Sequence, residues 1–593
     1  MNVLRKFLGI ALPVLVVFLA TLLVFAPGIT DGHLGADDWG YTYGCRFVKD
    51  GLTWANVTEA FLDPAHGAIW MPLTYCTYMA DISLFGNGWA AHHAVNAILH
   101  AVNACLVFAF ILLLVRRFAG RTGWTGVWIC AFAALVWSLH PMRAEAVTYI
   151  ASRKEELWTA FALLGLFSWA FFLVRGRWEG YALALVFFVL SCLSKPTAVC
   201  FVPLAVLLQV VLTGRLRRRL SAYVPFLVLT LGVGALALYS QAHPTGAEEA
   251  DVFNAGFGWR VLNACVSVGL YLFHTIVPTG IHLDYRAVFG GWPVDGGLGL
   301  GVSLAAVAVL ASTVLFCRRR PLRVAIGFAG LWFLLGLLPT LGIFGYVNGD
   351  QAAADRYTYL PAIAFSFLLA LGAVKATDRR SGRLGLMAGL LTLAALEVFA
   401  ALPVIASFKD DYAAFARTLQ RDPEHWRALR VVGNEYCARR GRMAEGVEML
   451  RRSLRNRPSQ QTADSLAYVL SIRGATGDFD EVKRLGAPFR ANPKLDGRGL
   501  MLDALAIVSM REGDHAGAVT LFEAALAAPR RTHTKAHALL NLGLSLANIG
   551  RDREALAALE AVSRAADGGV RARATGAMAV IRSGARRKPF VWR

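Results

Sequence analysis

The segment HLGADDWGYT, residues 33–42, places two adjacent carboxylates, Asp37 and Asp38, about ten residues beyond the first long apolar run. Ionised groups are costly near membrane hydrocarbon, so a pair held this close to it needs a reason. A carboxylate within hydrogen-bond reach of a hydroxyl can accept its proton as a general base. Alternatively, the pair is solvated and caps a helix at the membrane surface. The choice depends on the side of the membrane that this loop faces.

Further charged groups gather in three other segments, HPMRAEAVTYIASRKEE, LSKPT and NGDQAAADRYTY. Their candidate residues are His140, Glu145, Arg153, Lys154, Lys195, Asp355, Arg356 and Tyr357. Helical spacing from Glu145 to Glu155 would align acids on one face, either for binding or in a salt-bridged helix at the interface. Arginine suits bidentate phosphate contact and lysine supplies a point charge. Alternatively, Lys195 and Arg356 only anchor helix ends at the membrane surface.

The composition indicates a membrane protein. The chain has 593 residues, 56% of them apolar, and a mean hydropathy of +0.49. The chain has a net charge of +20, but many of its cations cluster in short loops between apolar runs, so we do not expect nucleic-acid binding. The nine cysteines contain no C-x-x-C pair. A divalent ion would suit the carboxylates, but we predict no metal.

Eleven apolar runs have spanning length or fall somewhat short of it. They begin near Phe7, Trp89, Trp124, Leu157, Trp178, Ala198, Tyr223, Leu298, Val324, Tyr357 and Leu384. With the N terminus in the cytoplasm, alternation puts every strongly basic loop inside and the unusual polar residues on the extracytoplasmic face. The run from Val261 to Pro278 would break this agreement if it spanned, so we expect it to be re-entrant or interfacial. We predict a multi-pass protein of the inner (cytoplasmic) membrane.

After Phe408 the sequence becomes polar, arginine-rich and helix-favouring. A glycine recurs at Gly441, Gly477, Gly513 and Gly550, at spacings of 36, 36 and 37 residues, close to the period of tetratricopeptide helix pairs. The second unit is degenerate, and a generic array of helical hairpins is the alternative. Stacked pairs bury faces that no single pair could bury, and they commonly hold a peptide in a groove. An odd number of spans puts these repeats on the face that carries the aspartates.

We therefore predict an all-α protein with two domains. Residues 1–408 form the transmembrane domain, with a first external loop at 28–88, and residues 409–593 form an extracytoplasmic, tetratricopeptide-like helical solenoid.

Segments in the same order along nearly the whole chain resemble bacterial relatives of the transmembrane and tetratricopeptide repeat (TMTC) family. They are DDWGY, GLTWANVTEAF, WMPLTYCTYMADISLFG, AAHHAVNAILHAVNACL, HPMRAEAVTYIASRKEEL, LSKPTAVCFVPL, YLFHTIVPTGIHLDY and DRYTYLP. Two positions depart from the bacterial pattern. Met71 stands where histidine commonly precedes PLT, and Arg143 stands where a second histidine commonly follows HP.

The resemblance implies a GT-C glycosyltransferase fold. Members of that fold move a sugar from a polyprenyl-phosphate carrier to an extracytoplasmic acceptor, usually with inversion, and the TMTC relatives look like protein O-mannosyltransferases. It implies that this chain transfers one sugar to serine or threonine hydroxyls of a protein held by the repeats. Many relatives work without metal, and no other cofactor is implied.

The resemblance also assigns roles. It places the catalytic base in the first external loop, as Asp37 or Asp38, without deciding between them. We expect the phosphate of the donor to bind Arg356, Lys195 and Tyr357, and Asp355 to orient Arg356. We expect the sugar or the acceptor to be bound, or the base supported, by His140, Glu145, Arg153 and Lys154.

Two alternatives stay open. The chain could transfer sugar to a glycolipid or cell-wall glycan, with the repeats serving assembly, or it could be a non-enzymatic membrane scaffold whose repeats recruit partners. A transporter is disfavoured because transporters place their charges near the bilayer midplane, whereas these charges lie in loops.

Overall fold

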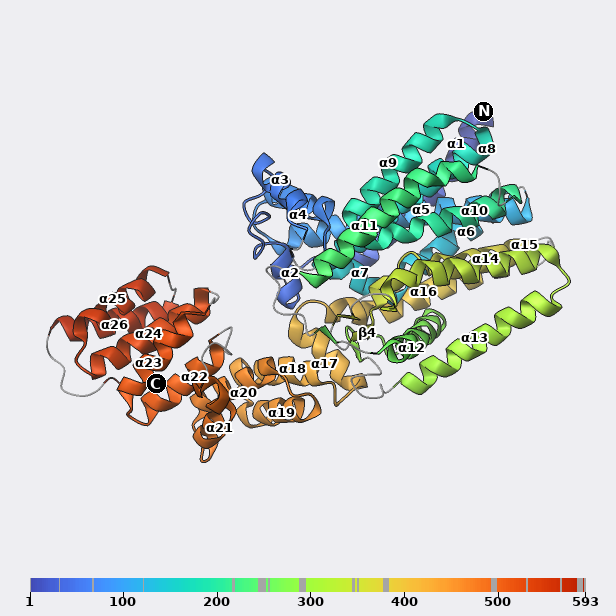
Figure 1. Ribbon diagram of the computed structural model, residues 1–593. Coiled ribbons are helices and arrows are strands. Elements are labelled where there is room, and N and C mark those ends of the chain that lie inside the picture. The colour runs from blue at the N-terminus through green and yellow to red at the C-terminus, as the bar shows by residue number, and fades with distance from the viewer. Residues whose placement is uncertain are drawn as a thin grey trace. The chain divides into compact units, whose positions relative to one another are not determined.

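The computed structural model divides into two compact units, unit 1 (Met1–Arg421) and unit 2 (Asp422–Arg593), both built almost entirely of helices (Figure 1). The division falls after Arg421, against the boundary at residue 408 predicted from composition. The structure describes residues 2–30, 32–64, 66, 69–120, 122–215, 219–243, 252–253, 256–286, 295–343, 347–348, 351–376, 383–491, 499–528, 532–565, 568–583 and 590.

Unit 1 is a bundle of apolar helices around one extended core (Figure 1). Its long apolar segments contain α1 (Asn2–Phe25), α5 (Trp89–Ala119), α8 (Arg153–Arg175), α10 (Phe201–Thr213) with the preceding 3-10 turn η4 (Pro196–Cys200), α11 (Val224–Ala242), α13 (Gly296–Phe316), α14 (Arg320–Leu337) and α16 (Arg383–Ser407). Within the described residues, eight helical segments are long and apolar enough to cross a membrane, or nine if one bent pair counts as a span. These segments support a multi-pass membrane protein.

Fewer described segments reach spanning length than the eleven predicted spans. The run that begins at Trp124 forms α6 (Trp124–Ser138) and then bends by 59° into Pro141–Thr148, which includes α7 (Ala144–Thr148). Pro141 lies at this break, and a proline lacks the N–H that a continuous helix needs.

Two other predicted runs form shorter helices. The run from Trp178 gives α9 (Trp178–Ser194) with 17 residues, and the run from Tyr357 gives α15 (Ile363–Ala376) with 14. Pro196 forces Lys195 into an extended conformation, which ends α9. α12 (Phe257–Ile276), which covers most of the run predicted to be re-entrant or interfacial, is not among the eight long apolar segments.

Residues 28–88 fold into a small layer with its own apolar cluster. This layer contains α2 (Gly35–Tyr41), α3 (Trp54–Leu62) and α4 (Pro72–Phe85). Ile150 and Ala151, from the turn before α8, complete the cluster, and the Tyr78 hydroxyl donates to the Ile150 carbonyl at 2.7 Å. The layer is thereby fixed to the start of α8, which brings the two aspartates of α2 beside that turn.

Two short antiparallel strand pairs join loops that are far apart in sequence. β1 (Val252–Phe253) pairs with β3 (Val347–Asn348), and β2 (Tyr285–Arg286) pairs with β4 (Gln351–Ala353). β4 leads into a single 3-10 turn, η8 (Asp355–Thr358), so the second pair sets Tyr285 against Asp355. α17 (Asp411–Arg421) is the last helix of unit 1.

In its described residues, unit 2 forms four helical hairpins followed by one further helix (Figure 1). Its helices are α18 (Trp426–Ala438), α19 (Met443–Asn456), α20 (Gln460–Arg473), α21 (Asp478–Ala491), α22 (Leu500–Arg511), α23 (His515–Leu526), α24 (Thr532–Asn548), α25 (Asp552–Ala565) and α26 (Gly568–Arg582). The recurring glycines Gly441, Gly477, Gly513 and Gly550 lie in the turns inside the hairpins, with φ of 64°, 83°, 90° and 83°. Glycine adopts this left-handed conformation without strain, which explains the repeat of 36 to 37 residues. The predicted helical repeats are confirmed, and the degenerate second unit folds as the others do.

Candidate active site

Asp37 and Asp38 lie on α2 in opposite environments. Asp38 is fully buried, and its two carboxylate oxygens each accept a main-chain N–H at 2.7 Å, from Leu34 and from Ala151. Burial raises the pKa of the Asp38 carboxyl well above its usual range, although the hydrogen bonds from the two main-chain N–H groups oppose the rise. The Asp37 side chain is exposed. Asp38 therefore ties α2 to the turn before α8, and Asp37 is the member of the pair that a substrate can reach.

Two tyrosines, Tyr41 and Tyr149, lie within range of the charge of Asp37 and of a nearby cation. Burial, and next the charge of Asp37, raise the pKa values of Tyr41 and Tyr149 well above the usual range. The charge of Arg356 opposes the rise at both phenols. Lys154, the second residue of α8, places its ammonium 4.4 Å from the centroid of the Tyr41 ring. Asp37 and Arg356 thus lie within electrostatic range of both phenols, and Lys154 lies against the ring of Tyr41.

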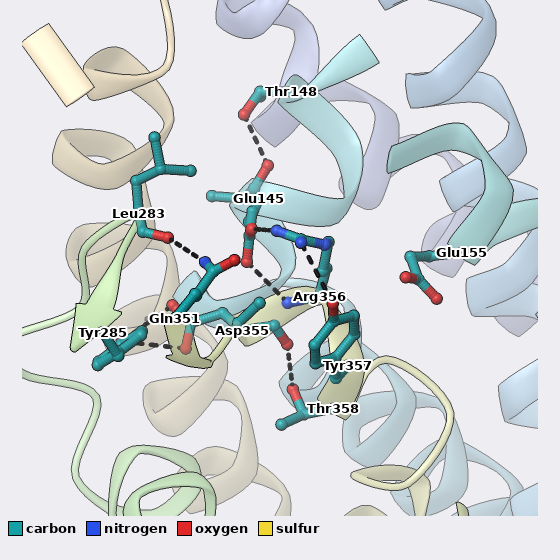
Figure 2. Close-up of polar contacts among 12 residues, drawn as sticks. Glu145, Thr148, Glu155, Leu283, Tyr285, Gln351, Asp355, Arg356, Tyr357 and Thr358 are labelled. Carbon is teal, nitrogen blue, oxygen red and sulfur yellow. Dashed lines mark hydrogen bonds and ion pairs between the residues drawn. The ribbon is translucent and has the colours of Figure 1, made fainter. Parts of the chain in front are cut away.

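Arg356, on η8, is paired with Glu145 of α7 (Figure 2). The guanidinium forms an ion pair with the buried carboxylate, whose other oxygen accepts the Arg356 main-chain N–H at 2.9 Å. Both the side chain and the backbone of this residue are therefore held by one acid. Figure 2 shows the two side chains directed at each other, with Glu155 standing apart.

Asp355 does not take the predicted role of orienting Arg356. Its carboxylate accepts the Tyr285 hydroxyl at 3.0 and 3.2 Å, and Thr358 donates to its main-chain oxygen at 2.7 Å (Figure 2). Burial and the nearby charge of Glu145 raise the pKa of Asp355 well above its usual range. Asp355 anchors η8 to β2, and Glu145 is the acid that orients the arginine.

Lys195 and Arg356 approach the same aromatic ring from separate elements. The Lys195 ammonium and the Arg356 guanidinium each lie 4.9 Å from the centroid of Tyr357. Lys195 is also in a buried ion pair with Glu155, which accepts the Trp158 indole N–H at 2.8 Å. The three residues predicted to bind phosphate are therefore together, and each of the two cations has its own carboxylate.

We call these residues the central cluster. It comprises Asp37, Tyr41, Glu145, Tyr149, Lys154, Glu155, Lys195, Arg356 and Tyr357, and its three carboxylates balance its three cations. An exposed carboxylate beside fixed cations can accept a proton while an anionic group is stabilised next to it.

Arg153, predicted to bind sugar or acceptor, lies in a separate structural network. Its guanidinium pairs with Asp81 at 2.6 Å, donates to the His92 carbonyl at 2.9 Å and to Asn96 at 2.7 Å, and lies over the ring of Tyr78. These contacts satisfy each guanidinium nitrogen and tie α8 to α4 and α5. Asp81 was missed from sequence, although an acid inside the apolar segment TYMADISLF was a signal for a buried ion pair.

His140 also lies in a separate group of side chains. Its Nδ1 accepts the Met142 N–H at 3.2 Å, and its Nε2 lies 3.9 Å from the carboxylate of Glu397 on α16. Arg143, one of the two departures from the family pattern, is buried and donates to Thr358 at 2.6 Å. Met71, the other, is buried in the core of the 28–88 layer.

Among the residues that the structure describes, no three histidine, cysteine or acidic side chains are grouped as a metal site would require. The independence from metal stays a prediction.

Comparison with known proteins identifies a similar protein from another organism. The chain is 23% identical over 312 residues to the protein O-mannosyl-transferase F38B6.6 of Caenorhabditis elegans, a match that covers 51% of this chain and 41% of that protein. The chain therefore spans less than half the length of that relative. No protein-family model matches the chain. The crystal structure of yeast Tom70 aligns with 77% of this chain and 93% of its own at a TM-score of 0.21 and 11% identity, which carries no argument about fold.

Proposed function

We propose that this protein is a membrane glycosyltransferase of the GT-C type. It moves a single sugar from a polyprenyl-phosphate carrier to serine or threonine hydroxyls of a protein, with inversion. The similarity to a protein named as an O-mannosyl-transferase supports the reaction class. The observation that carries the proposal is the exposed carboxylate of Asp37 beside the cations of the central cluster.

In the proposed reaction, Asp37 accepts the proton of the acceptor hydroxyl as its oxygen attacks the anomeric carbon. The bond between that carbon and the phosphate oxygen breaks, and the lipid phosphate leaves with the electron pair. Attack on the face opposite the leaving group inverts the configuration. We assign this role to Asp37 and not to Asp38, because Asp38 is buried and each of its oxygens already accepts a main-chain N–H.

Arg356 and Lys195 would stabilise the charge that develops on the leaving phosphate. Glu145 and Glu155 keep these cations compensated before the donor binds. A buried cation without a partner would be costly, so these pairs make a permanent cationic site tolerable. The Tyr357 ring lies against both cations.

The proposed location is the inner membrane, with the N terminus in the cytoplasm and both the central cluster and unit 2 on the extracytoplasmic side. Unit 2 would hold the protein acceptor. This arrangement requires that the bent pair and the two shorter helices, α9 and α15, cross the membrane together with the eight long segments.

The test is sugar transfer by the purified full chain in lipid nanodiscs. Polyprenyl-phosphate-linked hexoses are supplied with a serine- and threonine-rich peptide or with a glycolipid acceptor, and products are identified by mass spectrometry. We expect one hexose on the peptide, with the anomeric configuration opposite to that of the donor. Transfer to the glycolipid alone would overturn the protein acceptor, and no transfer from any donor would overturn the reaction.

A further inference from the structure

The side chain of Asn548, the last residue of α24, forms two hydrogen bonds with the main chain of Phe590, which lies outside the helices. The Phe590 N–H donates to its Oδ1 at 2.8 Å, and its Nδ2 donates to the Phe590 carbonyl at 2.9 Å. The same Nδ2 lies 3.2 Å from Nε2 of His515, the first residue of α23. Asn548 and Phe590 are 42 residues apart in the sequence.

The Phe590 side chain reaches the apolar interior beside this contact. Its ring is partly buried and packs, together with Ile581 of α26, against both apolar clusters of unit 2. One cluster extends over α19 to α25, and the other lies between α24, α25 and α26. The ring therefore covers the junction between two parts of the core of unit 2.

The hydrogen bonds between Asn548 and Phe590 resemble those by which proteins bind the main chain of an extended peptide. In a hydrogen-bonded strand pair, one residue exchanges both its N–H and its C=O with its partner, and the Asn548 amide offers the same donor and acceptor to Phe590. These two hydrogen bonds involve only main-chain groups of the bound residue, so they do not depend on its side chain. Selectivity comes from the apolar surface that receives the side chain.

We propose that Asn548 and the adjoining apolar surface form a binding site for an extended polypeptide that carries a large apolar side chain. In this structure Phe590 fills the site as an internal ligand, and another segment must displace it to bind. The proposal does not depend on the glycosyltransferase activity, because it concerns peptide binding alone.

The test uses the purified chain shortened to end at Ser583, and a fluorescent peptide with the sequence of residues 584–593. We expect the shortened chain to bind the peptide, and the intact chain to bind it at least tenfold more weakly because its own Phe590 competes. Phe590→Ala in the peptide removes the buried ring and should weaken binding about tenfold. Asn548→Asp in the protein keeps the acceptor for the Phe590 N–H and loses the donor, so it should weaken binding several-fold.

Asn434→Ala is the matched control, because this asparagine donates to Ser465 elsewhere in unit 2 and should leave peptide binding unchanged. Three results would overturn the proposal. The shortened chain could stay folded and bind no peptide, or binding could be indifferent to both Phe590→Ala and Asn548→Asp. Alternatively, thermal unfolding could show that unit 2 collapses without residues 584–593, which would make Phe590 a part of the core rather than a ligand.

Discussion

Asp37 and Asp38 are neighbours on one short helix, yet only Asp37 is exposed. The two main-chain amides that hold Asp38 turn it into a brace between α2 and the start of α8. Asp37 points elsewhere, as adjacent helical positions must, and remains exposed. The sequence leaves the choice between the two open. Burial and hydrogen bonding favour Asp37, which is why we propose it as the base.

The raised pKa of Asp38 predicts a pH-dependent stability. The folded protein holds the proton of the Asp38 carboxyl more tightly than the unfolded chain does, where the pKa of this carboxyl is near the ordinary aspartate value of 3.8. The stabilisation of the folded protein by this bound proton is therefore fully present below about pH 4, and it is lost as the pH rises through the folded-state pKa of Asp38. As the pH falls from 8 toward 5, we expect the thermal midpoint of the wild type to rise relative to Asp38→Asn, which cannot titrate. Asp50→Asn, at an exposed acid of the same layer, should track the wild type.

Intrinsic fluorescence during heating measures these midpoints. A difference between wild type and Asp38→Asn that stays constant from pH 8 to pH 5 would show that Asp38 does not titrate in this way.

The pairing of Glu145 with Arg356 predicts strong energetic coupling. Glu145→Gln leaves a largely buried guanidinium without its counter-ion, which typically costs about 3 kcal/mol or more. The double variant Glu145→Gln/Arg356→Gln removes both charges, so its loss should be smaller than the sum of the single losses by about 1–3 kcal/mol. A double-mutant cycle on unfolding measures this difference. Arg46→Gln and Glu59→Gln, from an exposed ion pair, provide the control cycle and should be close to additive. Strict additivity at Glu145 and Arg356 would contradict the pairing.

Among the helices, the segment from His140 to Glu156 shows where periodicity misleads. Its spacing predicts one continuous acidic face, but the chain is extended at Tyr149, with φ of −87° and ψ of 110°, between α7 and the turn before α8. Glu145 therefore faces Arg356 whereas Glu155 faces Lys195. The break is set by tertiary partners, Asp38 among them, which local sequence does not reveal.

The close approach of α18 and α19 predicts opposite effects for two glycine substitutions. A Cβ on Gly446 would lie 2.6 Å from the Gly433 carbonyl oxygen and 2.4 Å from the Cys437 sulfur, so Gly446→Ala should destabilise unit 2 by about 1–3 kcal/mol. Gly576, inside α26, has nothing within 4 Å of that position, and Gly576→Ala should stabilise by up to about 1 kcal/mol. Thermal unfolding followed by circular dichroism distinguishes the two. Equal shifts in the same direction would contradict the packing.

For the chain as a whole, the sequence predicts long apolar helices and repeated helical hairpins best. Apolar length locates the long helices, and glycine spacing locates the four hairpins of unit 2. It predicts partners poorly, because the pairs that build the site join distant segments. Glu145 and Arg356 are 211 residues apart, and Tyr285 and Asp355 are 70 apart. Residue type indicated which side chains could bind phosphate, but the carboxylate facing each cation depends on tertiary packing.

The proposed topology predicts which loops are accessible from each side of the membrane. In a variant without the native cysteines, Asp50→Cys and Arg439→Cys should react with a membrane-impermeant thiol reagent added to spheroplasts. Arg177→Cys and Arg319→Cys should react only after the membrane is opened. All four are exposed positions outside the long apolar segments. Protection of residue 50 or 439 in intact spheroplasts would place it in the cytoplasm and rule out the proposed arrangement.

The most direct test of the proposal is single-turnover sugar transfer by Asp37→Asn, compared with wild type and Asp50→Asn at equal donor occupancy. A lost general base typically costs about 10²–10⁴-fold in rate. We predict a loss in that range for Asp37→Asn, with an unchanged thermal midpoint because this side chain is exposed, and an unchanged rate for Asp50→Asn. Transfer by Asp37→Asn at the wild-type rate would contradict the assignment of Asp37 as the base.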